Sequence, residues 1–224
     1  KVEFHSKLGN NQNDIKKNIG FLPERPFFYP HLTGREFCTF MGKLSGMNKK
    51  TINEQIKFWA PKFKIDFALD REINTYSKGM LQRVGFLVTL LHDPKFIILD
   101  EPLSGLDPIG RKNLKDIITE INKLGKTVFF SSHIISDVEE ICDNVIFLKS
   151  GELFYEGSVD KIIEDNMQLS SRIRFYNKNN EFEDVEIDND KKQEKIKALM
   201  DEGNKIISVT INKPTLEEVI YNVR

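Results

Sequence analysis

The chain has 224 residues, 39% of them hydrophobic and 30% charged, which is typical of a globular protein with one sizeable domain and a small appendage. Its formal net charge of −1 gives no reason to expect binding to nucleic acid or to an anionic membrane surface. Cys38 and Cys142 have no ligand-type neighbours at metal-binding spacing, so both are expected to be packed thiols in a reducing compartment. No apolar run approaches the ~20 residues that cross a bilayer, and we expect a soluble chain that reaches a membrane only through a partner.

The first 77 residues predict one short strand followed by helices. An Asn-rich turn over 9–13 precedes a strand over 19–22. Residues 31–77 then carry two sequences typical of capping boxes, Thr33 with Glu36 and Thr51 with Glu54, and each predicts the start of a helix. The helical faces expected in the core carry Phe37, Phe40, Met41 and Leu44 in the first helix, and Ile52, Ile56 and Trp59 in the second.

Residues 78–165 alternate helix and strand. An apolar stripe from residue 80 to residue 91 predicts a helix, and Phe-Ile-Ile-Leu at 96–99 predicts a strand buried on both faces. Asp107 and Pro108 open another helix that Gly125 ends, with Leu114, Ile117, Ile118, Ile121 and Leu124 as its core face. A further buried strand is expected at 127–130, and a hairpin at 145–155. This order favours an α/β fold with a parallel sheet and right-handed crossovers.

The segment after residue 165 has a different texture. It predicts a strand over 171–176, an acidic solvated loop within 177–190, a helix carrying Ile196, Leu199 and Met200, and a strand over 206–211. Thr215 and Glu218 are placed to cap a short last helix. We therefore expect a small α+β accessory region over 166–224, following a main domain over 1–165.

Two adjacent carboxylates give the strongest chemical signal. Asp100 and Glu101 follow the apolar strand directly and precede Pro102, so they lie at the end of a strand where open α/β sheets bind ligands. One carboxylate can hold Mg²⁺, which prefers oxygen ligands, and the next can orient or deprotonate a water. The alternative is a polar strand end before a proline turn, and this motif alone leaves the two readings evenly balanced.

Three further segments are weaker signals when taken singly. Ser77 and Gly79 stand at the start of a helix, whose free N–H groups can bind an anion, although an ordinary serine cap is the better reading of that segment alone. Ser104-Gly105-Leu106-Asp107 is a tight turn and helix cap in any case. His133 follows a strand and could contact a phosphate, whereas a lone histidine is more often a solvated loop residue.

In their order and spacing these segments resemble the nucleotide-binding cassette of ABC transporters. Leu99–Pro102 is similar to the end of the Walker B strand, and Tyr76–Met80 to the signature loop. Ser104–Asp107 resembles the D-loop, His133 the switch histidine, and Leu22–Pro26 the Q-loop. The resemblance covers roughly residues 15–160, and the tail resembles the C-terminal extension of bacterial export-type cassettes.

The resemblance implies a P-loop NTPase-type parallel sheet with an inserted helical subdomain, at about 31–77, and a role in ATP hydrolysis. Asp100 would bind Mg²⁺ together with Glu24, Glu101 would act as general base, and His133 would sense the γ-phosphate. A second cassette, identical or different, would present its signature loop to the ATP, and a transmembrane permease subunit would hold the pair at the inner face of the cell membrane. The implied nucleotide-binding residues are Glu24, Tyr76, Ser77, Lys78, Gly79, Met80, Asp100 and Asp107.

The sequence departs from the family pattern in three places. Glu24 stands where the Q-loop has glutamine, and Lys78 replaces the first signature glycine. The 224 residues contain no Gly-x4-Gly-Lys-Ser/Thr, the loop that cradles the β- and γ-phosphates. We therefore expect the cassette to lack its Walker A segment, to be inactive by itself, and to expose apolar surface where that segment would pack.

Two other functions stay open at the level of sequence. One is a soluble ABC-type ATPase of translation or DNA repair, although neither a second cassette with its linker nor a long coiled coil is visible in the chain. The other is a non-hydrolysing regulatory cassette, which the missing phosphate loop favours. The retention of Asp100, Glu101 and His133 argues against this second alternative.

Overall fold

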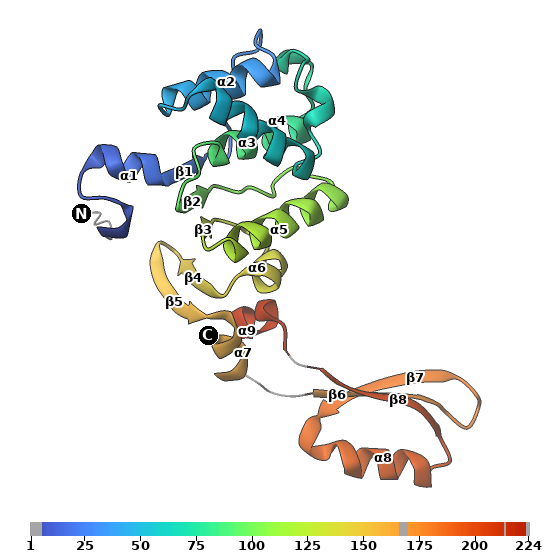
Figure 1. Cartoon of the computed structure of the whole chain (residues 1–224). Coiled ribbons are helices and arrows are strands. Elements are labelled where there is room, and N and C mark those ends of the chain that lie inside the picture. The colour runs from blue at the N-terminus through green and yellow to red at the C-terminus, as the bar shows by residue number, and fades with distance from the viewer. Residues whose placement is uncertain (1–5, 166–169, 213, 223–224) are drawn as a thin grey trace. The chain divides into compact units, whose positions relative to one another are not determined.

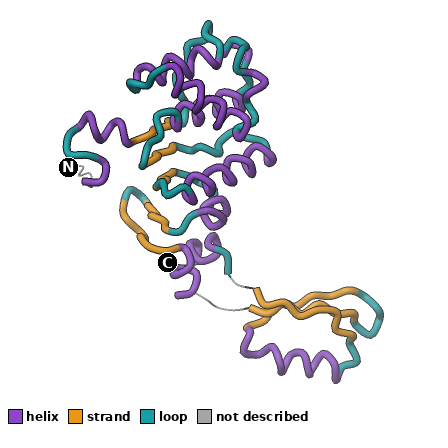
Figure 2. The backbone as a smooth tube through the Cα atoms, viewed as in Figure 1, coloured by secondary structure: helices purple, strands orange, loops and turns teal. Residues whose placement is uncertain are grey.

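A computed structural model describes residues 6–165, 170–212 and 214–222. The chain divides into two units, Lys1–His133 and Ile134–Arg224, which are described separately below (Figure 1). The first unit alternates helices and short strands, as the tube in Figure 2 shows. Its main elements are α1 (Gln12–Asn18), β1 (Ile19–Leu22), α2 (Gly34–Leu44), α3 (Lys49–Lys62), α4 (Lys78–Leu90), β2 (Phe96–Leu99), α5 (Pro108–Lys123) and β3 (Thr127–Phe130).

The three strands of the first unit form one parallel sheet in the order β1-β2-β3. Ile19 pairs with Phe96 and Phe96 with Thr127, so the strands begin and end in register. This confirms the parallel sheet expected from the alternation of helix and strand. Because the strands are parallel and in register, the residues that follow them, at positions 23, 100 and 131, lie at the same edge of the sheet.

One face of this sheet is covered and the other is open. Leu22, Ile97 and Leu99 are buried, and α4 lies against β1, where Gly85 contacts the Leu22 side chain. On the opposite face Phe21 is 58% exposed and Phe129 is 50% exposed. The expectation of burial on both faces is therefore wrong for β3 and met only in part for β2, whose Phe96 and Ile98 are half-buried.

The helical segment between β1 and β2 has a core of its own. The capping box at Thr33 is confirmed: its hydroxyl accepts the N–H of Glu36, whose carboxylate accepts the N–H of Thr33. The second predicted box is wrong, since α3 begins at Lys49 and the Asn48 side chain accepts the Thr51 N–H at 2.9 Å. Asparagine is an equally good cap, and its place three residues earlier shifts the start of the helix.

The core faces of the helices are partly as predicted. Ile52, Ile56 and Trp59 are buried in α3, and the Phe63 and Phe86 rings are 5.2 Å apart between centroids. In α2 the buried positions are Gly34, Phe37, Cys38 and Gly42, whereas Phe40 and Leu44 are exposed. The buried face of α2 is therefore rotated from the predicted one. Glycines occupy the positions where α2 approaches its neighbours, and a side chain at Gly42 would overlap Ile52.

Helix α5 begins and packs as its sequence indicates. Asp107 accepts the N–H of Gly110 at 3.1 Å, and Pro108 takes the first helical position. Its core face consists of Leu114, Ile117, Ile118 and Ile121. Leu124 is exposed, because the helix ends at Lys123 and Gly125 turns the chain at φ +80°.

The second unit contains α6 (Ile135–Ile141), β4 (Asn144–Lys149), β5 (Glu152–Ser158), α7 (Val159–Asp165) and α9 (Leu216–Asn222) around one apolar cluster. Strands β4 and β5 form the predicted antiparallel hairpin. Thr215 and Glu218 form the predicted capping box, and the Leu216 N–H donates to Glu139 of α6. The buried residues of this cluster are Val145, Val159, Ile162, Leu216 and Val219.

The unit also contains a three-stranded antiparallel sheet with one helix. Its elements are β6 (Ser170–Tyr176), β7 (Phe182–Asp188), α8 (Lys192–Asp201) and β8 (Lys205–Asn212), and the sheet order is β7-β6-β8. The acidic stretch expected as a loop is therefore largely the strand β7. Its Val185 and Ile187 pack against the small core of Ile173, Phe175 and Leu199, so that the acidic residues between them lie on the solvent face.

The division at residue 133 differs from the predicted one into a cassette over 1–165 and an accessory region over 166–224, which stays a prediction. Among the described residues, no helix is both long enough and apolar enough to cross a membrane.

Candidate active site

The predicted site lies at the carboxyl edge of the parallel sheet. Pro23 and Glu24 follow β1, Asp100 and Glu101 follow β2, and Ser131 follows β3. Backbone bonds bind these ends together: the Asp100 N–H donates to the Leu22 carbonyl at 2.8 Å, and the Ser131 N–H to the Leu99 carbonyl at 3.0 Å. The acids are thus placed by the sheet ladder itself, which continues one residue past each strand.

Ser131 connects the two acids. Its hydroxyl donates to Asp100 Oδ1 at 2.7 Å and accepts the backbone N–H of Glu101 at 2.9 Å. One side chain from β3 thereby fixes a carboxylate and the adjacent backbone of β2. Ser131 is not among the residues predicted from the sequence, because no residue pattern distinguishes this serine from an ordinary loop serine. The register of β2 with β3 is what reveals it.

Glu101 and His133 face each other. The imidazole Nδ1 of His133 lies 3.0 Å from both carboxylate oxygens of Glu101, so with the proton on Nδ1 the ring donates to the carboxylate and Nε2 is left for another group. Glu101 has φ +46°, a left-handed conformation that costs a non-glycine residue about 1–3 kcal/mol. The bonds at its N–H and at its carbonyl, which accepts the Ser104 N–H at 3.1 Å, hold it there.

The residues at this edge suit a magnesium ion that arrives with a nucleotide. No cluster of three metal-ligating acids, histidines or cysteines occurs in the described part of the chain, so the protein offers no closed metal cage there. Mg²⁺ needs only one or two carboxylates when phosphates and water complete its shell. Asp100 has a hydrogen bond to one oxygen only, and hard oxygen donors from Asp100 and Ser131 lie side by side.

The signature segment forms the tip of α4. Ser77 caps the helix, and its hydroxyl accepts the Met80 N–H at 3.3 Å. Ser77 and Lys78 are exposed, so both are accessible from outside the unit. The helix is 13 residues long and begins next to the exposed Ser77, and the N-terminus of a helix favours anions.

The D-loop residues pack against this helix tip. Gln82 of α4 is buried, and its amide donates to the Pro102 carbonyl at 3.0 Å. A side chain at Gly79 would meet Leu106 at 3.6 Å, and one at Gly105, which has φ +71°, would overlap the Lys78 side chain. The loop that follows the acids is therefore seated on the signature helix within the same unit.

Three other predicted residues have plainer surroundings. Tyr76 is buried, its hydroxyl donates to the Ala68 carbonyl at 2.6 Å, and burial raises its pKa. Glu24 is exposed and lies 4.0 Å from its neighbour Arg25. The Asp107 side chain caps α5 by accepting the Gly110 N–H. Their roles toward a nucleotide stay predictions.

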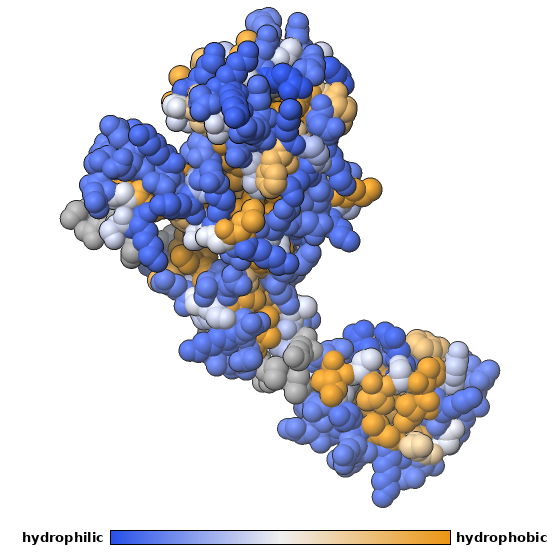
Figure 3. All heavy atoms as spheres, viewed as in Figure 1, coloured by the Kyte–Doolittle hydropathy of each residue, from blue (hydrophilic) through white to orange (hydrophobic). Residues whose placement is uncertain are grey.

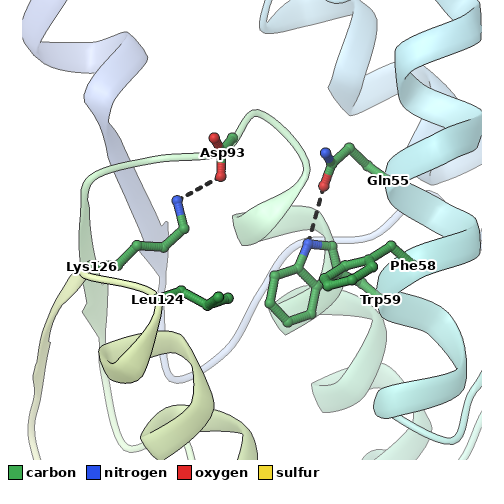
Figure 4. A pocket seen from close by; sticks show the side chains of 6 residues that line it. All are labelled: Gln55, Phe58, Trp59, Asp93, Leu124 and Lys126. Carbon is green, nitrogen blue, oxygen red and sulfur yellow. Dashed lines mark hydrogen bonds and ion pairs between the residues drawn. The ribbon is translucent and has the colours of Figure 1, made fainter.

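An open pocket of about 380 Å³ lies at the opposite edge of the sheet (Figure 4). It is lined by Gln55, Phe58, Trp59, Asp93, Leu124 and Lys126. Lys126 bonds to Asp93 at 2.6 Å and to the Pro94 carbonyl at 2.8 Å, before β2 and β3 begin. Gly125-Lys126-Thr127 is therefore a structural turn between α5 and β3, and this pocket lies at the opposite end of the strands from the acids.

A parallel sheet with helices, and with paired acids, a histidine and a capped helix tip, is an α/β arrangement of P-loop NTPase type. Residues 2–104 match the family model described as ABC transporter. The chain is 41% identical over 155 residues to the uncharacterized ABC transporter ATP-binding protein YxlF of Bacillus subtilis, covering 69% of this chain and 52% of that protein. It is 34% identical over 152 residues to the ABC transporter ATP-binding protein NatA of the same organism, covering 67% of this chain and 62% of that protein.

A solved structure described as the ATP binding subunit of an ABC transporter superposes with a TM-score of 0.62 at 26% identity, over 68% of this chain and 64% of that one. Over about two thirds of its length the chain is therefore similar to ATP-binding cassettes of ABC transporters. It spans about half the length of the curated relatives it matches, as the 52% of YxlF illustrates.

Proposed function

We propose that the protein containing this chain is the ATP-hydrolysing subunit of an ABC transporter that drives export. The observation that supports this most is the convergence of Asp100, Glu101, Ser131 and His133 at one sheet edge. Bound Mg²⁺ would be held by Asp100, with Glu24 from the Q-loop position, and would neutralise charge on the phosphates. Glu101 would accept a proton from the attacking water, because its carboxylate is partly exposed and fixed in direction by the bonds on either side of it.

His133 has a defined part in this proposal. Its Nδ1 faces Glu101, so the ring holds the base in place while Nε2 is directed elsewhere and can contact a γ-phosphate oxygen when it carries a proton. Histidine suits both contacts because each ring nitrogen is a separate bonding group. The ring is largely solvent-accessible, as a group that meets a ligand must be.

The signature residues support a two-cassette arrangement. Ser77 and Lys78 are exposed at the tip of α4, where the Ser77 hydroxyl accepts the Met80 N–H of its own helix. We propose that Ser77 and Gly79 contact the ATP of a second cassette, identical or different, and that Lys78 adds a positive charge there. The second cassette would in turn supply its own helix tip to this site.

An aromatic surface near α2 supports contact with a transmembrane permease subunit. Phe27 is 77% exposed, and the Tyr29 ring contacts Phe27 and Phe40 edge to face, with centroids 5.4 and 5.5 Å apart. Clustered exposed aromatic rings are typical of protein interfaces. Docking there would place the cassette at the cytoplasmic face of the cell membrane, held through its partner.

Glu101→Gln tests the proposal in the natural full-length protein. The amide keeps the shape and cannot accept the proton, so kcat should fall by about 100-fold or more while binding of a fluorescent ATP analogue with Mg²⁺ changes little. Glu54→Gln, an exposed acid on α3, is the matched control and should leave both unchanged. The proposal fails if Glu101→Gln hydrolyses ATP at the normal rate, or if the unsubstituted protein with Mg²⁺ binds no nucleoside triphosphate.

The 224 residues by themselves should show no turnover. They contain no loop of Gly-x4-Gly-Lys-Ser/Thr type to cradle the phosphates. An ATPase assay on this stretch, with the full-length protein as the positive control, checks this expectation.

A further inference from the structure

The buried amide of Gln82 has no part in the chemistry proposed above. Over α2–α4 the surface seen in Figure 3 is mostly hydrophilic, as expected where the polar side chains of helices face solvent. Gln82 is an exception, because it is only 7% exposed. Its side-chain nitrogen donates to the Pro102 carbonyl at 3.0 Å, and a buried amide without such a partner would be destabilising. The bond therefore makes a specific connection between α4 and the segment after β2.

Pro102 has few other ways to be attached to its surroundings. A proline has no backbone N–H, so its carbonyl is the one backbone group that can form a hydrogen bond. Pro102 is buried, and it directly follows Glu101. Gln82 therefore holds the backbone immediately after the proposed base.

The backbone of Glu101 needs support on both sides. Its φ of +46° is left-handed, whereas a residue that precedes a proline prefers extended backbone. On the N-terminal side the Ser131 hydroxyl accepts the Glu101 N–H at 2.9 Å, and on the C-terminal side the Gln82 amide binds the next carbonyl. A return of Glu101 to extended backbone would reorient the segment between these two bonds, so the two bonds together maintain the unfavoured conformation.

Two contacts beside Gln82 place the same loop on the same face of α4. A side chain at Gly79 would meet Leu106 at 3.6 Å, and one at Gly105 would overlap Lys78. Positions 78, 79 and 82 lie within about 100° of one another around the helix, because each residue advances it by roughly that angle. Among these three contacts, that of Gln82 is the one that combines burial with a hydrogen bond.

We infer that Gln82 is a positioning residue for Glu101, and that it fixes the direction of the proposed base by holding the Pro102 carbonyl. The inference rests on the proposed function, since the position of Glu101 affects turnover only if its carboxylate takes up the proton. It connects a side chain of the signature helix to the catalytic edge of the sheet. In this role Gln82 acts through Glu101 and makes no contact with the substrate.

Gln82→Met in the natural full-length protein removes the donor and keeps about the same side-chain length. We expect kcat to fall about 10-fold because Glu101 is less well oriented, while binding of a fluorescent ATP analogue with Mg²⁺ changes by less than about two-fold. Gln55→Met is the matched control. Gln55 accepts the Trp59 indole N–H at 3.1 Å, so this variant also loses one glutamine hydrogen bond and should lower Tm without lowering kcat. If Gln82→Met does not fold, Gln82→Asn replaces it, because its amide is one methylene shorter and does not reach Pro102.

A double substitution separates a positioning role from a general loss of structure. In the Glu101→Gln background the residual rate should be the same with and without Gln82→Met, because the proton acceptor that Gln82 positions is already lost. A further loss of about 10-fold in the double variant would overturn the inference, since Gln82 would then act independently of Glu101. A normal kcat for the Gln82 variant while Glu101→Gln is slow would overturn the inference alone. Normal turnover by Glu101→Gln would refute the proposed function, and the inference with it.

Discussion

Removing the Ser131 hydroxyl tests whether the proposed activity depends on how Asp100 and Glu101 are oriented, because both side chains stay in place. In Ser131→Ala, Asp100 loses the donor at 2.7 Å and the Glu101 N–H loses its acceptor at 2.9 Å. Glu101 would then be free to leave its φ of +46°, which is held partly by that bond. Asp100 and Glu101 themselves would be unchanged.

The size of the effect follows from the two bonds. A hydrogen bond contributes about 0.5–1.5 kcal/mol net, and this site is exposed, so water replaces part of each bond. Release of the backbone strain offsets a further part of the loss. We therefore expect a net destabilisation of about 1 kcal/mol, which lowers Tm by roughly 3–6 °C for a unit of this size. The effect on turnover should be larger, with kcat falling about 10- to 100-fold, as is found when groups that orient metal ligands are removed.

The assay compares three variants of the natural full-length protein in steady-state ATPase and thermal unfolding. Ser131→Thr keeps the hydroxyl and should recover most of kcat. Thr119→Ala deletes a hydroxyl that bonds within α5, to the Lys115 carbonyl at 3.0 Å, and should lower Tm slightly without changing kcat. The Mg²⁺ concentration at half-maximal rate should rise in Ser131→Ala, because Asp100 is less well oriented.

Two results would refute this reasoning. If Ser131→Ala kept the normal kcat and the normal Mg²⁺ dependence, the hydroxyl would have no role in orienting the acids. If Ser131→Thr were as slow as Ser131→Ala, the loss would come from packing in the loop and not from the hydrogen bonds.

Three more predictions concern stability and reactivity. Ile97→Ala, at a fully buried position of β2, should cost about 2–5 kcal/mol, measured by urea unfolding. Burial raises the pKa of Cys38 to about 12 and that of Cys142 to about 11, so at pH 8 only about one Cys142 thiol in a thousand is ionised, and alkylation should be slow until the chain is unfolded. The hydrogen bond from Arg35 lowers the pKa of Asp70, so that stabilisation is present above the ordinary carboxyl pKa and is lost as the pH falls through the lowered value; the Tm advantage of the wild type over Asp70→Asn should shrink below pH ~4.

Local signals predicted the elements well where a short-range bond decides the structure. The capping boxes at Thr33 and Thr215 and the Asp107-Pro108 helix start are confirmed because each is made by residues within four positions of one another. Predictions failed where distant packing decides. Strand β7 was not predicted because its sequence is mostly acidic and only Val185 and Ile187 pack on its core. Phe129 is exposed because the burial of a strand depends on which elements cover the sheet, and the strand's own sequence does not show this.

The candidate site divides in the same way. Asp100, Glu101 and His133 could be named from their order along the chain, since each follows a strand of recognisable sequence. Ser131 and Gln82 could not, because their partners are 31 residues away for the Ser131–Asp100 bond and 20 for the Gln82–Pro102 bond. A serine in a loop and a glutamine in a helix are ordinary in sequence, and only the register of β3 and the packing of α4 show that both bond to the segment after β2.

The residues that sequence missed explain how the acids could respond to the helix tip. The loop after β2 is held at three points: Ser131 fixes it to β3, Gln82 fixes Pro102 to α4, and Lys78 lies over Gly105. Between these points Glu101 occupies a strained conformation that persists only while its neighbours hold it. A displacement of the α4 tip, such as contact with a ligand at Ser77 would produce, therefore moves the Pro102 and Gly105 attachments directly. Glu101 lies between these attachments with its φ of +46°, so a movement of the α4 tip should reach the residue that we propose as the general base.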